Sequence, residues 1–553
     1  MSFEDIYEAV YETYYPPGMW DRMVQAGEPD SLNLAEEALG RHGDSEETAL
    51  RIRDFETGAD EVYSFAELND AANRAANYFE ETMNRGERFG VMLPAVLERY
   101  AAIFGGIKSH RMFVPLDTKF GPEALSYRLD DAGATTIVTT PEYLDAVEPD
   151  AVDSLERVIV VGGGDETVGD LEVVGYEEVA SASSDYEAIR MHPTQPYSVG
   201  YSSGTTGQPS QDPSPHATCV AIEPYLTYVV DMQPEDTYFA AASPAWAYGL
   251  TVGTLSPGLR GTNIGAYRGR FDLEVWLQTL EDWEVTNAMV APTALRQLKA
   301  SDIDVGSYDI DLRVLVTAGE TLDEATAEWV RENLGTPALD AYGLSEGGMV
   351  LCNYPFPDWE IKPGSMGKPL PGYDVALLET DDGVGTGEPV PEDEVTVIED
   401  HGETGEIGIH MTGGHGPIEG MMDEGWLRTG DLAEVDEDGY WWYRGRADEV
   451  IISAGYRIGP EEVQATLTDH DAVEEAGVIG VPHETRGNIV KGFITLAPGH
   501  EESADLLEEI TQFTKAELSK HEYPRELEVV EELPKTASDK ILRRELYERH
   551  DGD

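Results

Sequence analysis

Segments with helical periodicity alternate with short apolar segments along the first three hundred residues, and this alternation constrains the fold more than any other feature. Phe65, Leu68 and Ala72 recur at helical spacing. Ser64 followed by Glu67 is the residue pair that caps the start of a helix. Further elements are expected as follows: strands at 89–93, 112–115, 135–139, 157–161, 238–242, 262–266, 288–291 and 314–317, and helices at 100–107 and 273–282. Helices and strands that take turns predict an α/β fold with mainly parallel sheets.

The chain of 553 residues is too long for one hydrophobic core, so two or more domains are expected. Acidic, glycine-rich segments that look like hairpins lead through residues 405–443, and a compact αβ pattern follows. We predict a large N-terminal domain of several subdomains over residues 1–446 and a small α+β C-terminal domain over residues 447–553. The acidic stretch 379–400 is expected to be a solvated loop.

The net charge of −71 comes from 108 acidic and 37 basic residues that are spread along the chain. Nucleic acid and anionic membrane surfaces are therefore not expected as partners, because both would be repelled. Only ten of the basic residues are lysine. An acidic, lysine-poor surface is typical of halophilic proteins that work in cells with molar internal salt, where charges are screened over a few ångströms.

Cys219 and Cys352 are the only cysteines, so the sequence predicts neither a disulfide framework nor a zinc site. The acidic N-terminus does not resemble a signal peptide, and no apolar run is long enough to span a membrane. A cytoplasmic protein is expected. The sequence leaves open whether the chain forms a homo-oligomer.

Residues 201–209 read Tyr-Ser-Ser-Gly-Thr-Thr-Gly-Gln-Pro and combine four Ser and Thr hydroxyls with two glycines. Glycine lets backbone N–H groups approach an anion closely, and the hydroxyls add further donors. No lysine follows the second glycine, so this is not a Walker A loop. The composition predicts a phosphate-binding loop.

Five later stretches accompany this loop. They are Ala318-Gly-Glu-Thr321 after an apolar strand, Asp340-Ala-Tyr-Gly-Leu-Ser-Glu346 after a short strand, Thr429-Gly-Asp431, Gly445-Arg-Ala-Asp448, and Pro534-Lys-Thr-Ala-Ser-Asp-Lys540. In this order the six motifs resemble those of the AMP-forming acyl-CoA synthetases, in the adenylate-forming superfamily that also contains luciferases and peptide-synthetase adenylation domains. The resemblance covers residues 60–550 and implies the adenylate-forming enzyme fold.

The resemblance implies that ATP activates a carboxylic acid. Tyr342 would stack on adenine, Ser345 would bond phosphate, and Glu346 would hold Mg²⁺, which prefers carboxylate and phosphate oxygens. Lys540 matches the catalytic lysine that bridges the α-phosphate and the attacking carboxylate. Asp431 would accept both ribose hydroxyls. The full set implied for ATP and AMP is Ser202, Ser203, Gly204, Thr205, Thr206, Gly207, Gly319, Glu320, Thr321, Asp340, Ala341, Tyr342, Gly343, Leu344, Ser345, Asp431, Arg446, Arg457 and Lys540.

Residues 455–460 match the Gly-Tyr-Arg-Ile-Gly-Pro signature of the medium-chain, short-chain and aromatic acyl-CoA ligases. In that subgroup the positions that match residues 454–456 contact the pantetheine arm of coenzyme A, and the position that matches Arg457 contacts ATP. Asp448 matches the hinge about which the C-terminal domain turns. The positions implied for coenzyme A are Ala454, Gly455, Tyr456, Arg486, Lys515, Tyr523, Pro524 and Arg525. Independently of any family, half of the ten lysines lie from residue 491 onward, which favours an anion-binding surface there.

Three positions depart from the family pattern. Ser210 stands where the phosphate loop normally has lysine, and Asp539 stands where the last motif has glycine. The segment between Gly408 and Trp426 looks shortened. The missing lysine affects the expected binding of the γ-phosphate. Asp539 in place of glycine affects the expected freedom of the loop that carries Lys540.

The sequence therefore predicts an ATP- and Mg²⁺-dependent ligase that forms acyl-AMP, releases pyrophosphate and transfers the acyl group to coenzyme A. Short- to medium-chain fatty acids or related acids are the expected substrates, with Trp246 and Gly249 in the acyl pocket. A benzoate-type aryl-CoA ligase, an enzyme that loads a carrier protein, and a non-catalytic relative that binds nucleotide or acyl-adenylate remain as alternatives.

Overall fold

The computed structural model describes residues 7, 24–28, 30–202, 209–344, 347–356, 358–380, 389–411, 425–447, 449, 451–453, 456–483, 487–497, 499–518, 523–535 and 541–552. The chain divides into two compact units, and each is described by itself below. The first unit comprises residues 1–374 and 412–423, and the second comprises residues 375–411 and 424–553. The boundary that the sequence places at residue 446 stays a prediction, since the contacts group the acidic hairpin segments with the C-terminal residues.

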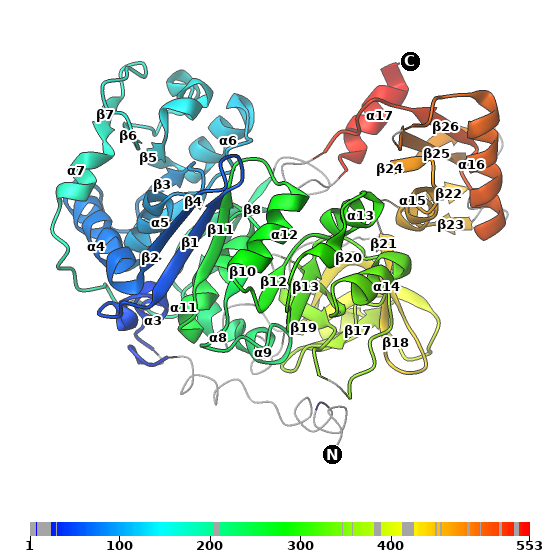
Figure 1. Ribbon diagram of the computed structural model, residues 1–553, viewed down its shortest axis with the longest axis horizontal. Coiled ribbons are helices and arrows are strands. Elements are labelled where there is room, and N and C mark those ends of the chain that lie inside the picture. The colour runs from blue at the N-terminus through cyan, green and yellow to red at the C-terminus, as the bar shows by residue number, and fades with distance from the viewer. Residues whose placement is uncertain are drawn as a thin grey trace. The chain divides into compact units, whose positions relative to one another are not determined.

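A seven-stranded sheet begins the first unit, with strand order β7-β6-β5-β3-β4-β8-β9 (Figure 1). All pairs in it are parallel except β8 with β9. The strands are β3 (Arg88–Val91), β4 (Met112–Pro115), β5 (Ala134–Thr139), β6 (Arg157–Val160), β7 (Glu172–Gly175), β8 (Pro196–Ser202) and β9 (Ser210–Pro215). The accompanying helices are α4 (Phe65–Thr82), α5 (Leu97–Ser109), α6 (Pro122–Ala132), η2 (Pro141–Ala146), η3 (Pro149–Ala151) and α7 (Tyr176–Ser181).

Helix α4 begins where the sequence predicts. The Ser64 side chain accepts the Glu67 N–H, and the Glu67 side chain accepts the Ser64 N–H, so the capping box is present. Phe65, Leu68 and Ala72 are buried on the face that packs toward α5. The helical periodicity therefore marks the buried face correctly.

Two further sheets complete the first unit. One has the order β10-β12-β13-β14-β15-β16 and is parallel from β10 to β14, and the other has the order β11-β1-β2. Their strands are β1 (Thr48–Asp54), β2 (Asp60–Ser64), β10 (Tyr238–Ala240), β11 (Ile264–Arg268), β12 (Asn287–Met289), β13 (Val314–Ala318), β14 (Ala338–Leu344), β15 (Gly348–Cys352) and β16 (Lys368–Pro369). The helices are α3 (Leu34–Ala38), η1 (Gly40–His42), α8 (Thr218–Ala221), α9 (Glu223–Tyr228), α10 (Ala247–Leu250), η4 (Thr251–Leu255), α11 (Ser256–Arg260), α12 (Leu273–Asp282), α13 (Pro292–Ala300), η5 (Val305–Ser307) and α14 (Glu324–Asn333). The predicted α/β fold with mainly parallel sheets is confirmed.

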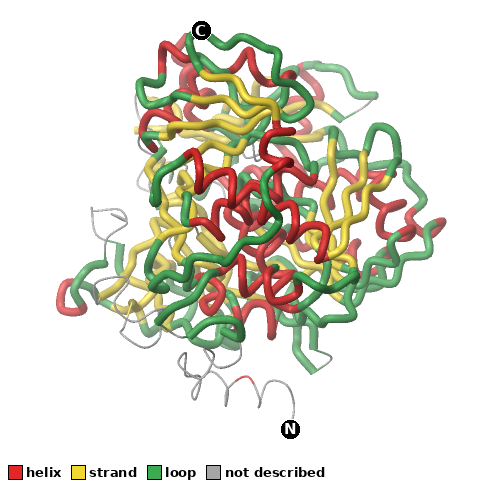
Figure 2. The backbone as a smooth tube through the Cα atoms, turned by 90° about the vertical axis from the view of Figure 1, so that its left-hand side faces the viewer, coloured by secondary structure: helices red, strands yellow, loops and turns green. Residues whose placement is uncertain are grey.

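The second unit contains two sheets, β18-β17-β19-β20-β21 and β23-β22-β25-β24 with β26 beside β25. The strands are β17 (Asp374–Leu378), β18 (Val397–Ile398), β19 (Thr404–Met411), β20 (Gly425–Val435), β21 (Trp441–Arg446), β22 (Ile451–Ser453), β23 (Tyr456–Ile458), β24 (Val473–His483), β25 (Gly487–Leu496) and β26 (Glu526–Val529). The helices are η6 (Glu392–Glu394), α15 (Pro460–Thr468), α16 (Ala504–Glu517) and α17 (Arg543–Gly552). Figure 2 shows strands gathered into sheets with helices beside them.

The described part of the acidic stretch 379–400 is mostly exposed to solvent, as the sequence predicts. It is not all loop, because Val390 bridges to Trp426 and β18 pairs with β17 through Val397 and Leu378. The prediction of a loop is therefore wrong for β18.

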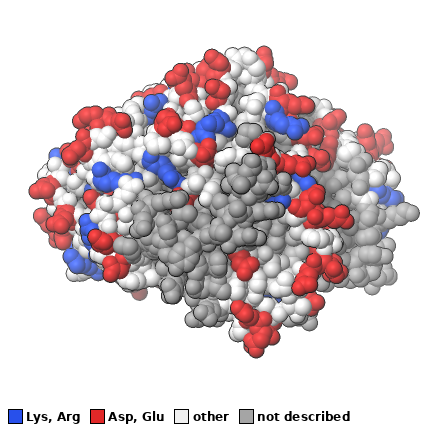
Figure 3. All heavy atoms as spheres, turned by 90° about the horizontal axis from the view of Figure 1, so that it is seen from below, with Lys and Arg blue, Asp and Glu red and all other residues white. Residues whose placement is uncertain are grey.

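Acidic side chains are scattered over the face shown in Figure 3 and do not gather in one patch. Both cysteines are free and buried. Among the described residues, no helix is long and apolar enough to cross a membrane.

Candidate functional site

Two of the predicted nucleotide-binding segments lie side by side at the carboxyl ends of neighbouring parallel strands. Strand β13 pairs with β14 so that Ala318 lies opposite Ala341. Gly319 follows directly with a φ of +95° and open space where a Cβ would lie. Carboxyl ends of parallel strands are where α/β sheets usually bind ligands. The arrangement suits a slot for a flat ring.

The Asp340 to Leu344 segment lies within strand β14 and does not follow it, contrary to the sequence prediction. The strand is longer because Tyr342 and Leu344 pair with Leu351 and Gly348 of β15. Tyr342 keeps part of its surface exposed. Ser345 and Glu346 lie outside the described residues.

The Glu320 carboxylate accepts hydrogen bonds from two side chains of helix α13. Its Oε2 accepts hydrogen bonds from Thr293 Oγ1 at 2.5 Å and from Arg296 Nη2 at 2.6 Å. Arg296 also donates to the Thr321 carbonyl at 3.0 Å. Helix α13, which carries Thr293 and Arg296, thus holds the turn after β13 in place, a role that local sequence patterns do not reveal.

Asp340 is 5% exposed, and burial raises the pKa of its carboxyl to about 8. Hydrogen bonds from the backbone N–H groups of Leu322 and Ala341, and the charge of Arg296, act in the opposite direction and are weaker. Asp340 is therefore neutral at pH 7, and it hydrogen-bonds the Leu322 backbone just past the turn after β13.

We expect Asp340→Asn to flatten the dependence of stability on pH. The folded carboxyl has a pKa of about 8, against 3.8 for an ordinary aspartate. The folded state therefore holds a proton that the unfolded state loses, so stability falls as pH rises from about 4 to about 8. Asparagine cannot ionise, so the free energy of unfolding of the variant should rise relative to that of the parent protein by a few kcal/mol across this pH range. Denaturant unfolding at pH 5, 7 and 9 measures the difference, and a gap that stays constant with pH would contradict the assignment.

Helix α6 holds both described ends of the phosphate loop. At the first end, Tyr201 Oη donates to the Asp131 carboxylate at 2.8 Å. At the second end, Tyr127 Oη donates to the Pro209 carbonyl at 2.7 Å. Ser202 pairs with Ser210 across β8 and β9. The loop therefore leaves and re-enters the sheet at one point, while Ser203 to Gly207 and the Ser202 side chain lie outside the described residues.

The predicted acyl-pocket segment forms a tight turn after β10. The Trp246 N–H donates to the Ser243 carbonyl at 3.1 Å, and the Trp246 ring lies edge-on to Phe120 with centroids 6.2 Å apart. A Cβ at Gly249 would lie 2.1 Å from the same carbonyl oxygen. Close packing is thus enough to require glycine at 249. Whether either residue lines an acyl pocket stays a prediction.

In the second unit, Asp431 and Arg446 lie opposite each other on β20 and β21. Arg446 Nη1 lies 3.3 Å from Asp431 Oδ1, which also accepts from Tyr443 Oη at 3.1 Å. Asp431 is 9% exposed. The structure brings Asp431, which the resemblance assigns to ribose, together with Arg446 of the set implied for ATP and AMP, and adds Tyr443 to them.

A second cluster in this unit centres on the Tyr523 ring. Lys515 Nζ lies 5.1 Å from the ring centroid, and the Arg525 guanidinium carbon lies 4.8 Å from it. Arg525 Nη1 also donates to Tyr523 Oη at 3.1 Å. Within the described part of the chain, neither cation pairs with a carboxylate. In so acidic a protein, two unpaired cations on one ring suit an anionic ligand.

Of the C-terminal lysines that the structure describes, Lys491 and Lys535 are less available than the clustering suggests. Lys491 pairs with Glu528 at 2.9 Å, and Lys535 pairs with Glu475 at 2.5 Å. Their charges are compensated, so the anion-binding surface predicted from lysine number alone is smaller than expected. The predicted residues that lie outside the described chain are Ser203, Gly204, Thr205, Thr206, Gly207, Ser345, Glu346, Asp448, Ala454, Gly455, Arg486 and Lys540, and the side chains of Tyr456 and Arg457 are not described either.

Metal binding cannot be assigned to the described residues, among which no group of three or more His, Cys, Asp or Glu side chains could hold an ion. Glu346 is the residue implied for Mg²⁺ and lies outside them.

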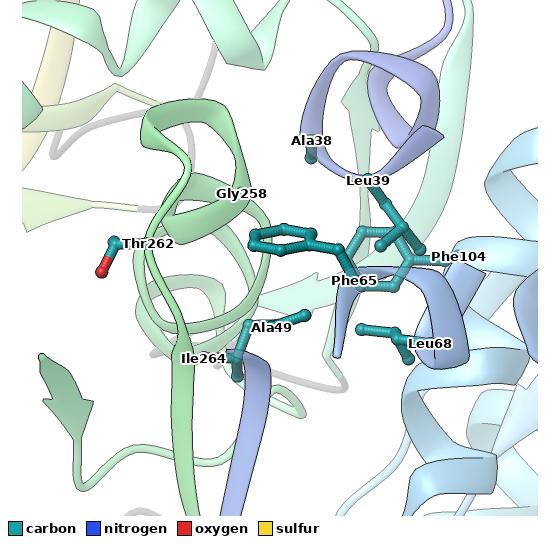
Figure 4. A pocket seen from close by; sticks show the side chains of 9 residues that line it. All are labelled: Ala38, Leu39, Ala49, Phe65, Leu68, Phe104, Gly258, Thr262 and Ile264. Carbon is teal, nitrogen blue, oxygen red and sulfur yellow. The ribbon is translucent and has the colours of Figure 1, made fainter. Parts of the chain in front are cut away.

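A small pocket of the first unit lies where α3, α4, α5 and α11 meet (Figure 4). Its lining residues are Ala38, Leu39, Ala49, Phe65, Leu68, Phe104, Gly258, Thr262 and Ile264. None of them is charged, and none belongs to the predicted site. The pocket is a packing gap beside the capped end of α4.

Known proteins match the chain along most of its length. Residues 34–414 match the AMP-binding enzyme family, and residues 462–540 match the AMP-binding enzyme C-terminal domain. The chain is 36% identical to acetyl-coenzyme A synthetase of Bacillus subtilis over 529 residues, which cover 93% of this chain and 90% of that protein. It is 32% identical to 4-hydroxybutyrate–CoA ligase 1 of Metallosphaera sedula over 511 residues, which cover 91% and 87%.

The crystal structure of the anthranilate CoA ligase AuaEII in complex with anthranoyl-AMP superposes with a TM-score of 0.80 at 27% identity, covering 94% of this chain and 98% of that one. The predicted adenylate-forming fold, with its large N-terminal and small C-terminal domain, is confirmed. Fold, motif order and these matches show that the chain belongs to the AMP-binding enzyme family and is an AMP-forming acyl-CoA ligase.

Proposed function

We propose that the enzyme converts a short- to medium-chain carboxylic acid, ATP and coenzyme A into acyl-CoA, AMP and pyrophosphate. The observation that supports coenzyme A as the acceptor is that Lys515 and Arg525, which pair with no described carboxylate, both lie close to the Tyr523 ring. Coenzyme A brings several phosphate charges that the acidic surface elsewhere would repel. A carrier protein, which is the alternative acceptor, would not need this compact cluster.

The first half-reaction places the substrate carboxylate in line with the α-phosphate. Positioning and charge neutralisation then account for most of the rate, because pyrophosphate is itself a good leaving group. Gly319 and Tyr342, at the ends of β13 and β14, would hold adenine, and Asp431 would hold the ribose. Lys540 would neutralise the charge that develops on the α-phosphate, and Mg²⁺ on Glu346 would shield the departing phosphates.

The second half-reaction would use a different face of the C-terminal domain from the one that carries Lys540. Gly455, which lies outside the described residues and follows β22 in the chain, would leave room for the pantetheine arm. A turn about Asp448 would exchange the two faces, a domain motion of the kind that gates many enzymes. The thiolate would then attack the acyl-adenylate carbonyl, and AMP would leave.

The proposal also names the class of carboxylic acid that the enzyme uses. Relatives named for acetate and 4-hydroxybutyrate favour a short chain, and the anthranilate ligase keeps an aryl acid as the second candidate. Pyrophosphate release measured across acetate, propionate, butyrate, hexanoate, octanoate, benzoate and anthranilate tests the proposal, with and without coenzyme A. Release that depends on none of these acids and on no dicarboxylic acid of similar length would overturn it, and ATP binding without pyrophosphate exchange would favour the non-catalytic alternative.

We expect Ser210→Lys to lower the Michaelis constant for ATP about tenfold, with little change in turnover. The backbone pairing places residue 210 opposite Ser202, at the mouth of the phosphate loop. A cation there would strengthen ATP binding equally in the ground and transition states, which is the signature of uniform binding. Ser210→Gln, which adds length without charge, is the matched control. An unchanged Michaelis constant would show that residue 210 does not reach the phosphates.

A further inference from the structure

Arg99, in the first turn of α5, carries a buried charge with one partner. Its side chain belongs to a residue that is only 7% exposed, and its Nη2 donates to Ser243 Oγ at 3.0 Å. Within the described residues the guanidinium makes no other hydrogen bond and no ion pair. A guanidinium has five N–H donors, so most of its capacity is unused by the protein.

The other deeply buried arginines of the first unit have more protein partners than Arg99, although Arg111 Nε is itself buried without a hydrogen bond. Arg53 donates to the carboxylates of Asp60 and Asp282. Arg111 donates to the backbone carbonyls of Ser109 and Met83. Because burying a charge is unfavourable unless it is paired, the solitary position of Arg99 calls for a partner that the chain itself does not supply.

Arg99 lies where the carboxyl ends of strands from two sheets meet. It follows β3 of the seven-stranded sheet, and Ser243 follows β10 of the six-stranded sheet. Ligands of α/β proteins bind at such edges. Asp117, which follows β4, is the carboxylate whose charge acts on Arg99, but no ion pair joins them. Asp117 Oδ1 instead accepts the Lys119 N–H at 2.9 Å within its own turn.

Ser243 connects Arg99 to the segment that the sequence assigns to the acyl pocket. The Ser243 carbonyl accepts the Trp246 N–H and contacts Gly249, while the Ser243 hydroxyl accepts from Arg99. The guanidinium therefore contacts, through Ser243, the turn that carries Trp246.

We propose that Arg99 binds a second carboxylate on the substrate and that the enzyme activates dicarboxylic acids. This inference rests on the proposed function, since it names the class of acid. Arginine matches a carboxylate with two parallel hydrogen bonds, and such pairs are strongest where water is excluded. A monocarboxylic acid in the same site would leave the guanidinium desolvated and unpaired, so it would be rejected.

The test compares acids of equal carbon number: succinate with butyrate, glutarate with valerate, and adipate with hexanoate. The readout is kcat/KM for pyrophosphate release, followed by coenzyme A-dependent thioester formation. For at least one pair the unmodified enzyme should prefer the dicarboxylate by roughly 100-fold, the range measured for removing one partner of a buried charge pair. Arg99→Met should abolish that preference by losing activity on the dicarboxylate and keeping or gaining activity on the monocarboxylate.

Arg99→Lys keeps the positive charge but cannot form the two parallel hydrogen bonds of a guanidinium, so it should retain part of the preference. Arg111→Met removes an equally buried arginine and should leave the preference unchanged, with melting temperatures recorded for every variant. A preference for monocarboxylates at all three lengths would overturn the inference and leave the proposed function standing. Equal loss on both acids in Arg99→Met, with a lower melting temperature, would make Arg99 a structural tie only. If Arg99→Met does not fold, the unmodified enzyme's preference decides. Activity with no acid of either class would overturn the proposed function as well.

Discussion

Replacing Lys540 with alanine should abolish acyl-adenylate formation while sparing the second half-reaction. The lysine is assigned to the α-phosphate, where a lost electrostatic contact raises the barrier by about 3–4 kcal/mol and slows adenylation by two to three orders of magnitude. Lys535 and Ile541, the described residues on either side of this segment, form a backbone bridge with each other. Single-turnover assays with carboxylate and ATP measure the first half, and synthetic acyl-AMP with coenzyme A measures the second.

Gly455→Leu is the matched variant for the other face and should do the reverse. Its side chain would enter the space assigned to the pantetheine arm, so thioester formation should fall while acyl-AMP still forms. The described neighbours Ser453 and Tyr456 pair across the hairpin that carries this glycine. If Lys540→Ala loses both halves equally, or Gly455→Leu loses only adenylation, the assignment of one half-reaction to each face is wrong.

Folding and activity should require salt on the order of 1 M. The net charge is −71, and several arginines already serve two carboxylates each: Arg53 pairs with Asp60 and Asp282, and Arg313 with Asp231 and Asp236. Most acidic groups therefore have no cation of their own and repel one another. Raising the salt from 0.1 M to 1 M shortens the screening length from about 10 Å to about 3 Å, which should favour the compact state.

The melting temperature should therefore rise by several degrees between 0.1 M and 2 M KCl, since an unfolding entropy of about 2 cal/mol/K per residue gives a chain of 553 residues a shift of roughly 1 °C for each kcal/mol of relieved repulsion. Sucrose of equal osmolality screens no charge and is the control, for which a much smaller rise is expected. A melting temperature that does not respond to KCl would show that the charge is compensated within the fold.

The elements that the sequence predicts well are those whose signals are local. Helix α12 spans Leu273–Asp282 as predicted, and α4 begins at the capping box of Ser64 and Glu67. Strand β9 was missed because Pro213 and Pro215 argue against a strand, but proline is tolerated at a sheet edge, which is where β9 lies. Strand β9 forms because it pairs with β8, although its own residues do not favour a strand.

The candidate site shows the same division. Motif order predicts that the turn after β13 and the Asp340 segment belong together, and strand pairing does place them side by side. Arg296, Tyr443 and Arg99 were missed because each acts through a partner more than ten residues away in the chain, and a lone arginine or tyrosine carries no motif. The elevated pKa of Asp340 was likewise hidden, since it comes from burial by neighbouring strands.

The central claim is that this enzyme activates a carboxylate by attack on the α-phosphate of ATP. Supplying an accepted acid labelled with ¹⁸O in its carboxyl group tests that step directly, with coenzyme A present to complete the turnover. One ¹⁸O atom should appear in the phosphate of AMP and none in pyrophosphate, because the bridging oxygen of acyl-AMP comes from the acid and stays with phosphorus when the thiolate attacks the carbonyl. Formation of ADP, or AMP that carries no label, would contradict the account.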